Sequence, residues 1–399
     1  MNSPAWMNPA AQTRSFWVLL GLGSVLLAIG LGAAQFMEVH GHVVTGMNNQ
    51  VVWGLPHVFA IFMIVAASGV LNVASVGSVF GQAAYKPRAA LSGLLCLALL
   101  AGGLLVLMLD LGRPDRVIIA ATHYNFTSVF ALNVFLYSGM AGIVLLYLWT
   151  LFERRRNAWS KPVGVLAMFW RFALTTGTGS IFGFLVARPA FQSALLAPLF
   201  IVLSLGWGLA VFLIAQAALY AWNGQLLSPE IERRMARLLC IFVLASLYMV
   251  AMQHLNGLYF ARQEPFEAFI LLGANGGAVY ALLFWLGFVL AGSLAPLLLL
   301  LHPQLGGARC TLAASVLVVA GAFAWLFVFI IGGQAFPMEI FPGFVASSSF
   351  GDGAVATYAP SLPEFLLGLG GLAAAFVLTL TGVRVLDFMP SDAPVKTQP

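Results

Sequence analysis

Residues 54–80 read GLPHVFAIFMIVAASGVLNVASVGSVF, and this stretch decides the fold class. It holds one histidine and no Asp, Glu, Lys or Arg. A membrane-spanning helix needs about 20 consecutive, mostly apolar residues. Pro56 suits the first turn of such a helix, because its missing N–H would have no intrahelical partner there. The stretch therefore predicts a transmembrane helix that begins close to Pro56.

Comparable apolar stretches recur along the chain and predict about ten transmembrane helices. They cover about 16–36, 54–80, 89–110, 127–151, 162–187, 196–222, 236–258, 278–300, 311–333 and 364–386. Of the 399 residues, 61% are hydrophobic and only 8% are charged, whereas a soluble domain carries roughly 25% charged residues. We therefore expect an all-α polytopic membrane protein, and the composition excludes a soluble domain and a nucleic-acid-binding protein.

The distribution of basic residues predicts the orientation in the membrane. Ten spans place both termini on one side, and most Lys and Arg residues fall in the loops of that side. The exceptions expected on the opposite side are Arg113, Arg116, Arg188 and Arg262, while Arg171 falls inside a span. The positive-inside rule then places both termini in the cytoplasm. We expect one integral membrane domain over 1–399, with a first bundle over about 54–187, a second over about 196–333 and a last helix at 364–386.

Polar side chains gather at the outer ends of the predicted helices. His57 follows Trp53 and Gly54, about one turn into the second span. Polar groups at this depth are costly and usually face the bundle interior. His57 is thus a candidate ligand or proton-carrying group, and the alternative is an interfacial histidine bonded to a nearby carbonyl.

Asp110 closes the third span and begins the segment Asp110-Leu-Gly-Arg113-Pro-Asp-Arg. Arg113 follows three residues later, so we expect it to fold back and pair with the Asp110 carboxylate. A nearby charge and desolvation both tune the pKa of a carboxyl group, which suits a proton relay. The alternative is an ordinary ion pair that fixes the turn.

His123, Tyr124 and Asn125 precede the fourth span and combine donors, acceptors and an aromatic ring. This mixture suits a quinone, which offers two carbonyl oxygens and a flat ring. Thr127 and Ser128 also suit a helix N-cap, so part of the pattern is structural. His254, near the outer end of the seventh span, is expected to join His57 around one pocket; the alternative is an interfacial histidine.

Resident redox groups are not expected in this chain. An iron–sulfur cluster usually takes about four thiolates, but the chain has three cysteines and no Cys-x-x-Cys. No clustered metal ligands occur, and the lack of Cys-x-x-Cys-His excludes a covalent haem. A haem held between two outer histidines remains an alternative. We expect Arg171 to snorkel toward the inner interface.

Several motifs carry a resemblance to a known family. They are Trp53-Gly54, Asp110-Leu-Gly-Arg113-Pro-Asp-Arg, His123-Tyr-Asn125-Phe-Thr-Ser, His254-Leu-Asn-Gly-Leu-Tyr259, Ile331-Gly-Gly-Gln334-Ala-Phe-Pro337 and Tyr358-Ala-Pro-Ser-Leu-Pro-Glu364. Over roughly residues 15–390 the chain resembles the NrfD/polysulfide-reductase membrane subunits. The later motifs resemble the ten-span branch, and within it the DsrP subunits of sulfite-reductase-associated complexes.

The resemblance implies a membrane subunit, without haem or iron–sulfur cluster, that binds menaquinone or ubiquinone near the outer face. It implies a ferredoxin-like iron–sulfur partner of the DsrO type in the periplasm, with DsrM-, DsrK- and DsrJ-like subunits nearby, in the inner membrane of a bacterium and in sulfur metabolism. By analogy the quinone site comprises His57, Asp110, Arg113, His123 and Asn125. From the residues themselves we add Trp53, Tyr124 and His254 to the quinone site, and expect Asp110, His57 and His123 to handle protons.

Two other classes of function remain as alternatives. A secondary transporter places its site near the membrane midplane on broken helices, whereas here the polar groups crowd one face. A passive anchor would not need Asp110, His57 and His123 together. A proton-translocating role is a further alternative, although acidic residues in mid-membrane are lacking.

Overall fold

The computed structural model describes residues 13–125, 127–224, 227–302, 307–338 and 353–386. The long helices are α1 (Thr13–His40), α2 (Leu55–Val70), α4 (Ala89–Leu109), α6 (Val129–Phe152), α7 (Ser160–Gly183), α8 (Leu196–Trp222), α9 (Pro229–Tyr259), α13 (Ala308–Leu326) and α15 (Leu362–Val385). Shorter ones are α3 (Asn72–Ala74), α5 (Val117–Thr122), α10 (Glu264–Leu271), α11 (Ala278–Leu282), α12 (Ala295–Leu301) and α14 (Gly333–Ala335). π-helical segments at Ser75–Val79, Leu283–Leu294 and Phe327–Gly332 continue several helices. No strand occurs among these residues, which confirms the all-α prediction.

Nine helices within the described residues are long and apolar enough to cross a membrane. The predicted span at 162–187 also forms a helix, α7, but α7 is not among the nine. Its apolar character is diluted by Arg171 and by a run of Thr, Gly and Ser residues. At 24 residues α7 is long enough, and it packs in the bundle between α6 and α8.

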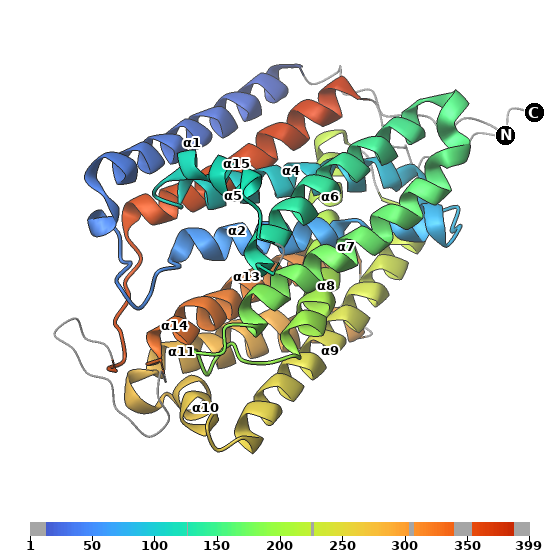
Figure 1. Cartoon of the computed structure of the whole chain (residues 1–399). Coiled ribbons are helices and arrows are strands. Elements are labelled where there is room, and N and C mark those ends of the chain that lie inside the picture. Colours follow the sequence, from blue (N-terminus) through green and yellow to red (C-terminus); the bar gives the residue numbers. More distant parts are fainter. Residues whose placement is uncertain (1–12, 126, 225–226, 303–306, 339–352, 387–399) are drawn as a thin grey trace, which may run out of the picture.

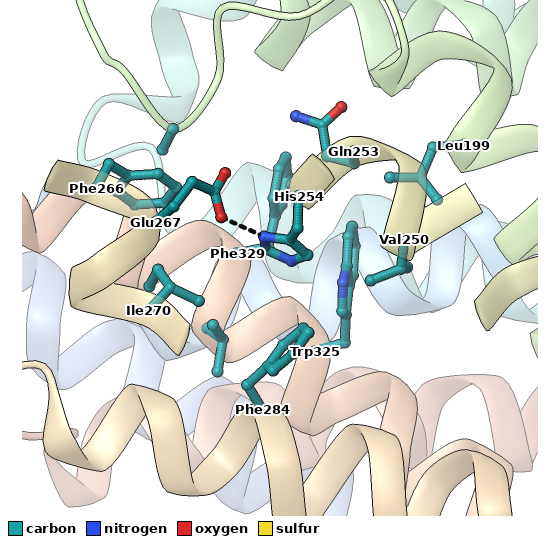
Figure 2. A pocket seen from close by; sticks show the side chains of 12 residues that line it. Leu199, Val250, Gln253, His254, Phe266, Glu267, Ile270, Phe284, Trp325 and Phe329 are labelled. Atoms are coloured by element: carbon teal, nitrogen blue, oxygen red, sulfur yellow. Dashed lines mark hydrogen bonds and ion pairs between the residues drawn. The ribbon is translucent and has the colours of Figure 1, made fainter. Parts of the chain in front are cut away.

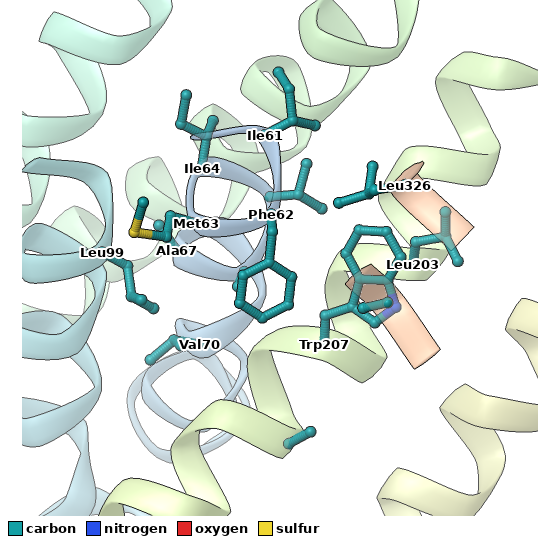
Figure 3. Packing of buried hydrophobic residues seen from close by; sticks show 14 of the residues in the cluster. Ile61, Phe62, Met63, Ile64, Ala67, Val70, Leu99, Leu203, Trp207 and Leu326 are labelled. Atoms are coloured by element: carbon teal, nitrogen blue, oxygen red, sulfur yellow. The ribbon is translucent and has the colours of Figure 1, made fainter. Parts of the chain in front are cut away.

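Helix α2 lies at the centre of the molecule. Every residue of its most apolar window is buried, because α4, α8, α13 and α15 all pack around it. Figure 3 shows Phe62 of α2 beside Trp207 of α8, with Leu99 of α4 on the other side. A β-carbon at Gly69 would lie only 1.6 Å from the Ser204 carbonyl oxygen, so glycine permits this close approach of α2 and α8. The opening stretch therefore forms the core of the fold.

Helices α1 and α15 lie side by side along one flank of the bundle (Figure 1). They are antiparallel, since Phe16 lies beside Arg384 and Gly30 lies against Gly370. The start of α1 and the end of α15 therefore lie at the same end of the bundle, as expected for ten crossings. We call the opposite end, where α2 begins and α4 ends, the His57 end.

The predicted division into two bundles remains a prediction. Helices α2, α4, α6 and α7 pack against one another, and so do α8, α9, the segment from α11 to α12, and α13. Helix α2, however, contacts α8 as well as α4, and α7 also packs on α8. The two groups of helices therefore share one continuous hydrophobic core.

Candidate functional site

His57 and Asp110 form a buried pair at the His57 end. His57 lies in the first turn of α2, and Asp110 directly follows α4. The His57 Nδ1 atom lies 2.7 Å from Asp110 Oδ2, and the two side chains are 13% and 1% exposed. Within the described residues, the other carboxylate oxygen, Oδ1, is buried and has no hydrogen-bond partner. A buried oxygen left unpaired is costly, so this atom is available to a ligand or a proton.

The partner of Nδ1 decides which nitrogen of His57 can exchange a proton. A carboxylate next to Nδ1 accepts the Nδ1–H bond and leaves Nε2 as the exchangeable nitrogen. The same carboxylate stabilises a positive charge on the ring. The pair is therefore built to accept a proton at Nε2 and to release it again.

Trp53 forms an aromatic wall beside the pair. Its ring stacks on the His57 ring at a centroid distance of 5.9 Å and an interplanar angle of 25°. Phe182 meets it edge-on at 5.5 Å, and Phe130 of α6 lies 6.3 Å away. Offset and edge-on arrangements of this kind are favourable. The wall offers a flat apolar face next to the ionisable pair.

Gln334 fixes the backbone of Trp53. Its side chain is fully buried. Its Nε2 donates to the Trp53 carbonyl oxygen at 2.9 Å, and its Oε1 accepts from the Trp53 N–H at 3.0 Å. Arg188 secures the same corner by donating to the Gln334 and Gln50 carbonyl oxygens at 3.0 and 2.7 Å. Burial lowers the pKa of Arg188.

Glu364 and Tyr358 support the start of α2 from the other side. Glu364 is fully buried and accepts the backbone N–H groups of Gly46 and Ser361 at 2.9 and 2.7 Å. The Tyr358 hydroxyl donates to Glu364 at 2.8 Å and accepts the Leu55 N–H at 2.7 Å. Burial, and then the negative charge of Glu364, raises the pKa of Tyr358 above its ordinary value.

Gly54 makes this support possible. A β-carbon at Gly54 would lie 2.3 Å from Glu364 Oε1 and 3.0 Å from the Tyr358 hydroxyl oxygen. Any larger residue would therefore displace the buried carboxylate. The Trp53-Gly54 motif thus combines an aromatic wall with a residue small enough to admit Glu364.

Arg113 does not pair with Asp110, so that expectation was wrong. Arg113 Nε lies 3.2 Å from Asp115 Oδ1, and both side chains are 62% exposed. The partner of Asp110 comes instead from α2, because α4 delivers the carboxylate into the bundle while the chain turns outward at Gly112.

The segment 123–125 lies at the surface. His123 and Asn125 are exposed. The His123 ring lies 3.1 Å from the Thr122 hydroxyl, and Asn125 accepts from the Thr127 backbone N–H at 3.0 Å. Tyr124 packs edge-on against Phe135 at 4.6 Å. These contacts are local, and the role of the three residues at the site remains a prediction.

His254 does not join His57, contrary to expectation. Its Nδ1 lies 2.6 Å from Glu267 Oε2, with side-chain exposures of 17% and 4%. This second pair lines a separate pocket between α9, α10 and the helices that carry Phe284 and Trp325 (Figure 2). The structure therefore contains two histidine–carboxylate pairs at the His57 end.

Arg171 is buried rather than snorkelling, so this expectation was also wrong. The side chain is 4% exposed and donates to the Ser68 carbonyl oxygen at 3.3 Å and to Asn72 Oδ1. These bonds join α7 to α2. Among the described residues, no group of three or more His, Cys, Asp or Glu side chains has the arrangement of a metal site.

Sequence reasoning missed the supporting residues. Gln334 and Tyr358 were noted only inside motifs, and Glu267 only as a residue of the loop. The signal for Glu364 was the spacing Ser361-Leu-Pro-Glu364, which is a helix capping box. The contacts of Gln334 and Tyr358 join positions about 280 and 300 residues away in the chain, so local patterns could not show them.

Comparison with known proteins places this geometry in a family. Residues 43–338 match the model of the family described as polysulphide reductase, NrfD. The chain is 29% identical over 372 residues to the Hdr-like menaquinol oxidoreductase integral membrane subunit of Archaeoglobus fulgidus, covering 92% of this chain and 93% of that protein. It is also 29% identical over 404 residues to a putative dimethyl sulfoxide reductase membrane protein of Halobacterium salinarum, covering 92% and 90%.

A third relative is the protein NrfD of Escherichia coli, which is 26% identical over 283 residues, covering 63% of this chain and 85% of that protein. The family match spans most of the chain and includes Trp53, His57, Asp110 and His254. The nine apolar helices and these relatives make the chain a multi-pass integral membrane protein. The chain therefore belongs to the NrfD polysulphide-reductase family, as its motifs predicted.

Proposed function

We propose that this chain is the quinone-reactive membrane subunit of a multi-subunit oxidoreductase, and that His57, Asp110 and Trp53 form its quinone site. The observation that carries the proposal is the His57–Asp110 contact of 2.7 Å with the second Asp110 oxygen left buried and unpaired. The name of the Archaeoglobus fulgidus relative, a menaquinol oxidoreductase subunit, supports a quinol as the substrate class.

The residues present fit a quinone headgroup. A quinol bound here supplies two electrons and, with them, two protons. Trp53 offers a flat apolar face, and His57 Nε2 and Asp110 Oδ1 offer two polar atoms that make no hydrogen bond within the described residues. His57 takes a proton at Nε2, and the Asp110 carboxylate at Nδ1 stabilises the resulting charge. Arg113, His123, Tyr124 and Asn125 stay in the proposal as outer contacts of the ligand.

The electrons pass to a partner, because the chain carries too few cysteines to hold a cluster alone. We assign that partner the character of a ferredoxin-like iron–sulfur subunit at the periplasmic face of a bacterial inner membrane. We further propose that the complex acts in sulfur metabolism and is of the DsrMKJOP type. The basis is the motif resemblance.

The test is a tryptophan-fluorescence titration of the full chain with a short-chain menaquinone analogue. Trp53 stacks on His57, so ligand binding at the proposed site should quench the emission saturably. Asp110→Asn and His57→Ala should weaken the binding at least tenfold. Asp115→Asn is the matched control, because it removes an exposed carboxylate five residues away. Equal binding by all four proteins would rule out the site.

A further inference from the structure

We propose that the pocket between α9 and α10 is a second binding site for a flat, oxygen-substituted ring, separate from the site at His57. The assignment of that ring as a quinone headgroup rests on the proposed function. The pocket itself rests on the structure alone. It has an empty volume of about 420 Å³, part of it open to the outside, which lies within the range of small-ligand sites.

Aromatic side chains form the walls of this pocket. Trp325 and Phe329 stack on each other with centroids 4.8 Å apart and an interplanar angle of 8°. Phe284 meets the His254 ring edge-on at 4.8 Å. All four residues line the pocket, together with aliphatic side chains that include Val328 (Figure 2). Such a lining favours a flat apolar ring over a cation, a sugar or a peptide.

Three polar side chains open into this apolar surround. His254 is bonded through Nδ1 to Glu267 at 2.6 Å, so Nε2 is the nitrogen that remains for a ligand oxygen. Gln253, the neighbouring residue, accepts from the Ser193 hydroxyl at 2.8 Å through its Oε1. Its amide nitrogen makes no hydrogen bond to the part of the chain that the structure describes. A few placed polar groups in an apolar pocket are what orients a ligand.

The carboxylate is built into the wall, as at the first site. Glu267 is 4% exposed, and Gly257 leaves the room that it occupies. A β-carbon at Gly257 would lie 2.0 Å from Glu267 Oε1. A buried carboxylate beside a histidine is the arrangement that suits proton exchange with a ring hydroxyl.

The backbone around the pocket is irregular. Phe284 belongs to the π-helical segment Leu283–Leu294, and Val328 and Phe329 belong to the π-helical segment Phe327–Gly332. π-helical turns are rare and occur frequently at functional sites. Two of them facing one pocket are therefore a second, independent indication of a site.

The two sites are distinct but lie close together. The pocket lining includes none of Trp53, His57 and Asp110. Aromatic contacts nevertheless connect them, because Phe182 lies 5.5 Å from Trp53 and 5.0 Å from Phe329. A ligand in the pocket would contact Phe329, two ring contacts away from Trp53.

The experiment is a calorimetric titration of the full-length chain in detergent with 2,3-dimethyl-1,4-naphthoquinone. The matched control is 2,3-dimethylnaphthalene, which has the ring but no oxygens. We expect a stoichiometry of about two in the wild type. Glu267→Gln should remove one binding event and Asp110→Asn the other. Val328→Phe fills the pocket without touching the His254–Glu267 pair, so it should also leave about one event if Glu267→Gln fails to fold.

Each outcome decides between the two proposals. One event that Asp110→Asn abolishes, and that Glu267→Gln and Val328→Phe leave intact, overturns the second site and leaves the proposed function standing. One event that Glu267→Gln or Val328→Phe abolishes and Asp110→Asn leaves intact supports the second site and overturns the first. No saturable binding, or equal binding of the naphthalene, overturns both.

Discussion

The two histidine–carboxylate pairs are alike in geometry and different in construction. Both use Nδ1 of the histidine, at 2.7 and 2.6 Å, and both carboxylates are buried. Asp110 and His57, however, come from two membrane helices 53 residues apart, whereas Glu267 and His254 are 13 residues apart across the turn from α9 to α10. The first pair therefore requires the packed bundle, while the second is formed within one local corner.

The pairs also differ in what surrounds them. The first stands between a stacked tryptophan and the fully buried Glu364–Tyr358 support, and it keeps one unpaired carboxylate oxygen. The second opens directly into a pocket lined by aromatic rings. The first is thus held rigidly for proton exchange, and the second is arranged for access. Mutations at the two pairs should therefore differ in their effects.

The largest expected effect is on turnover. His57→Ala and Asp110→Asn should each lower quinol oxidation by the assembled complex by about 10²–10⁴-fold, because they remove a positioned proton acceptor or its counter-charge. His254→Ala should lower it by less than about tenfold on the same scale. Steady-state assays with the iron–sulfur partner present measure this. An equal loss in all three variants would show that both pairs act in the same step.

The next effect is on stability and compares the two glycines that admit the buried carboxylates. In Gly54→Ala and Gly257→Ala the new β-carbon would lie 2.3 and 2.0 Å from Glu364 and Glu267. Each should cost about 1–3 kcal/mol, the usual range for overpacking. Gly54→Ala should abolish quinone binding at the first site only, and Gly257→Ala at the second only. Gly142→Ala is the control, since nothing lies within 4 Å of its β-carbon position.

The sequence predicted the architecture well because a membrane restricts the choice of structure. Continuous apolar runs in lipid must be helices, so the helices of the described residues follow the ten predicted spans. The same reasoning marked Trp53, His57 and Asp110. It failed for Arg113, because proximity in sequence suggested a partner that the geometry at the end of α4 does not allow. It also missed Gln334 and Glu364, whose partners lie some 280 to 320 residues away.

A smaller effect is expected from Tyr358→Phe at alkaline pH. The pKa of Tyr358 is raised in the folded protein, so its protonated form is favoured by folding. The stability this contributes is fully present below its ordinary pKa of 10 and is lost as the pH rises above that value. Tyr358→Phe should therefore flatten the decline of the unfolding midpoint between about pH 9 and 11, where tyrosine titrates. Tyr259→Phe, at an 86% exposed position, should leave the decline unchanged. A decline that persists in Tyr358→Phe would assign the alkaline loss to other groups.

The smallest effect is expected at the exposed Arg113–Asp115 pair. Arg113, chiefly through its hydrogen bond, lowers the pKa of Asp115, so the pair favours the folded state above the ordinary pKa of 3.8 and loses that contribution as the pH falls. Both side chains are 62% exposed, and solvent screens such pairs almost completely. Asp115→Asn should therefore leave the unfolding midpoint unchanged from about pH 3 to 7, in contrast to Asp110→Asn. Arg113→Gln should likewise retain quinol turnover if Arg113 acts only at the surface. A loss of about 100-fold, the size expected for a general acid–base group, would instead show that Arg113 swings from Asp115 to the bound ligand.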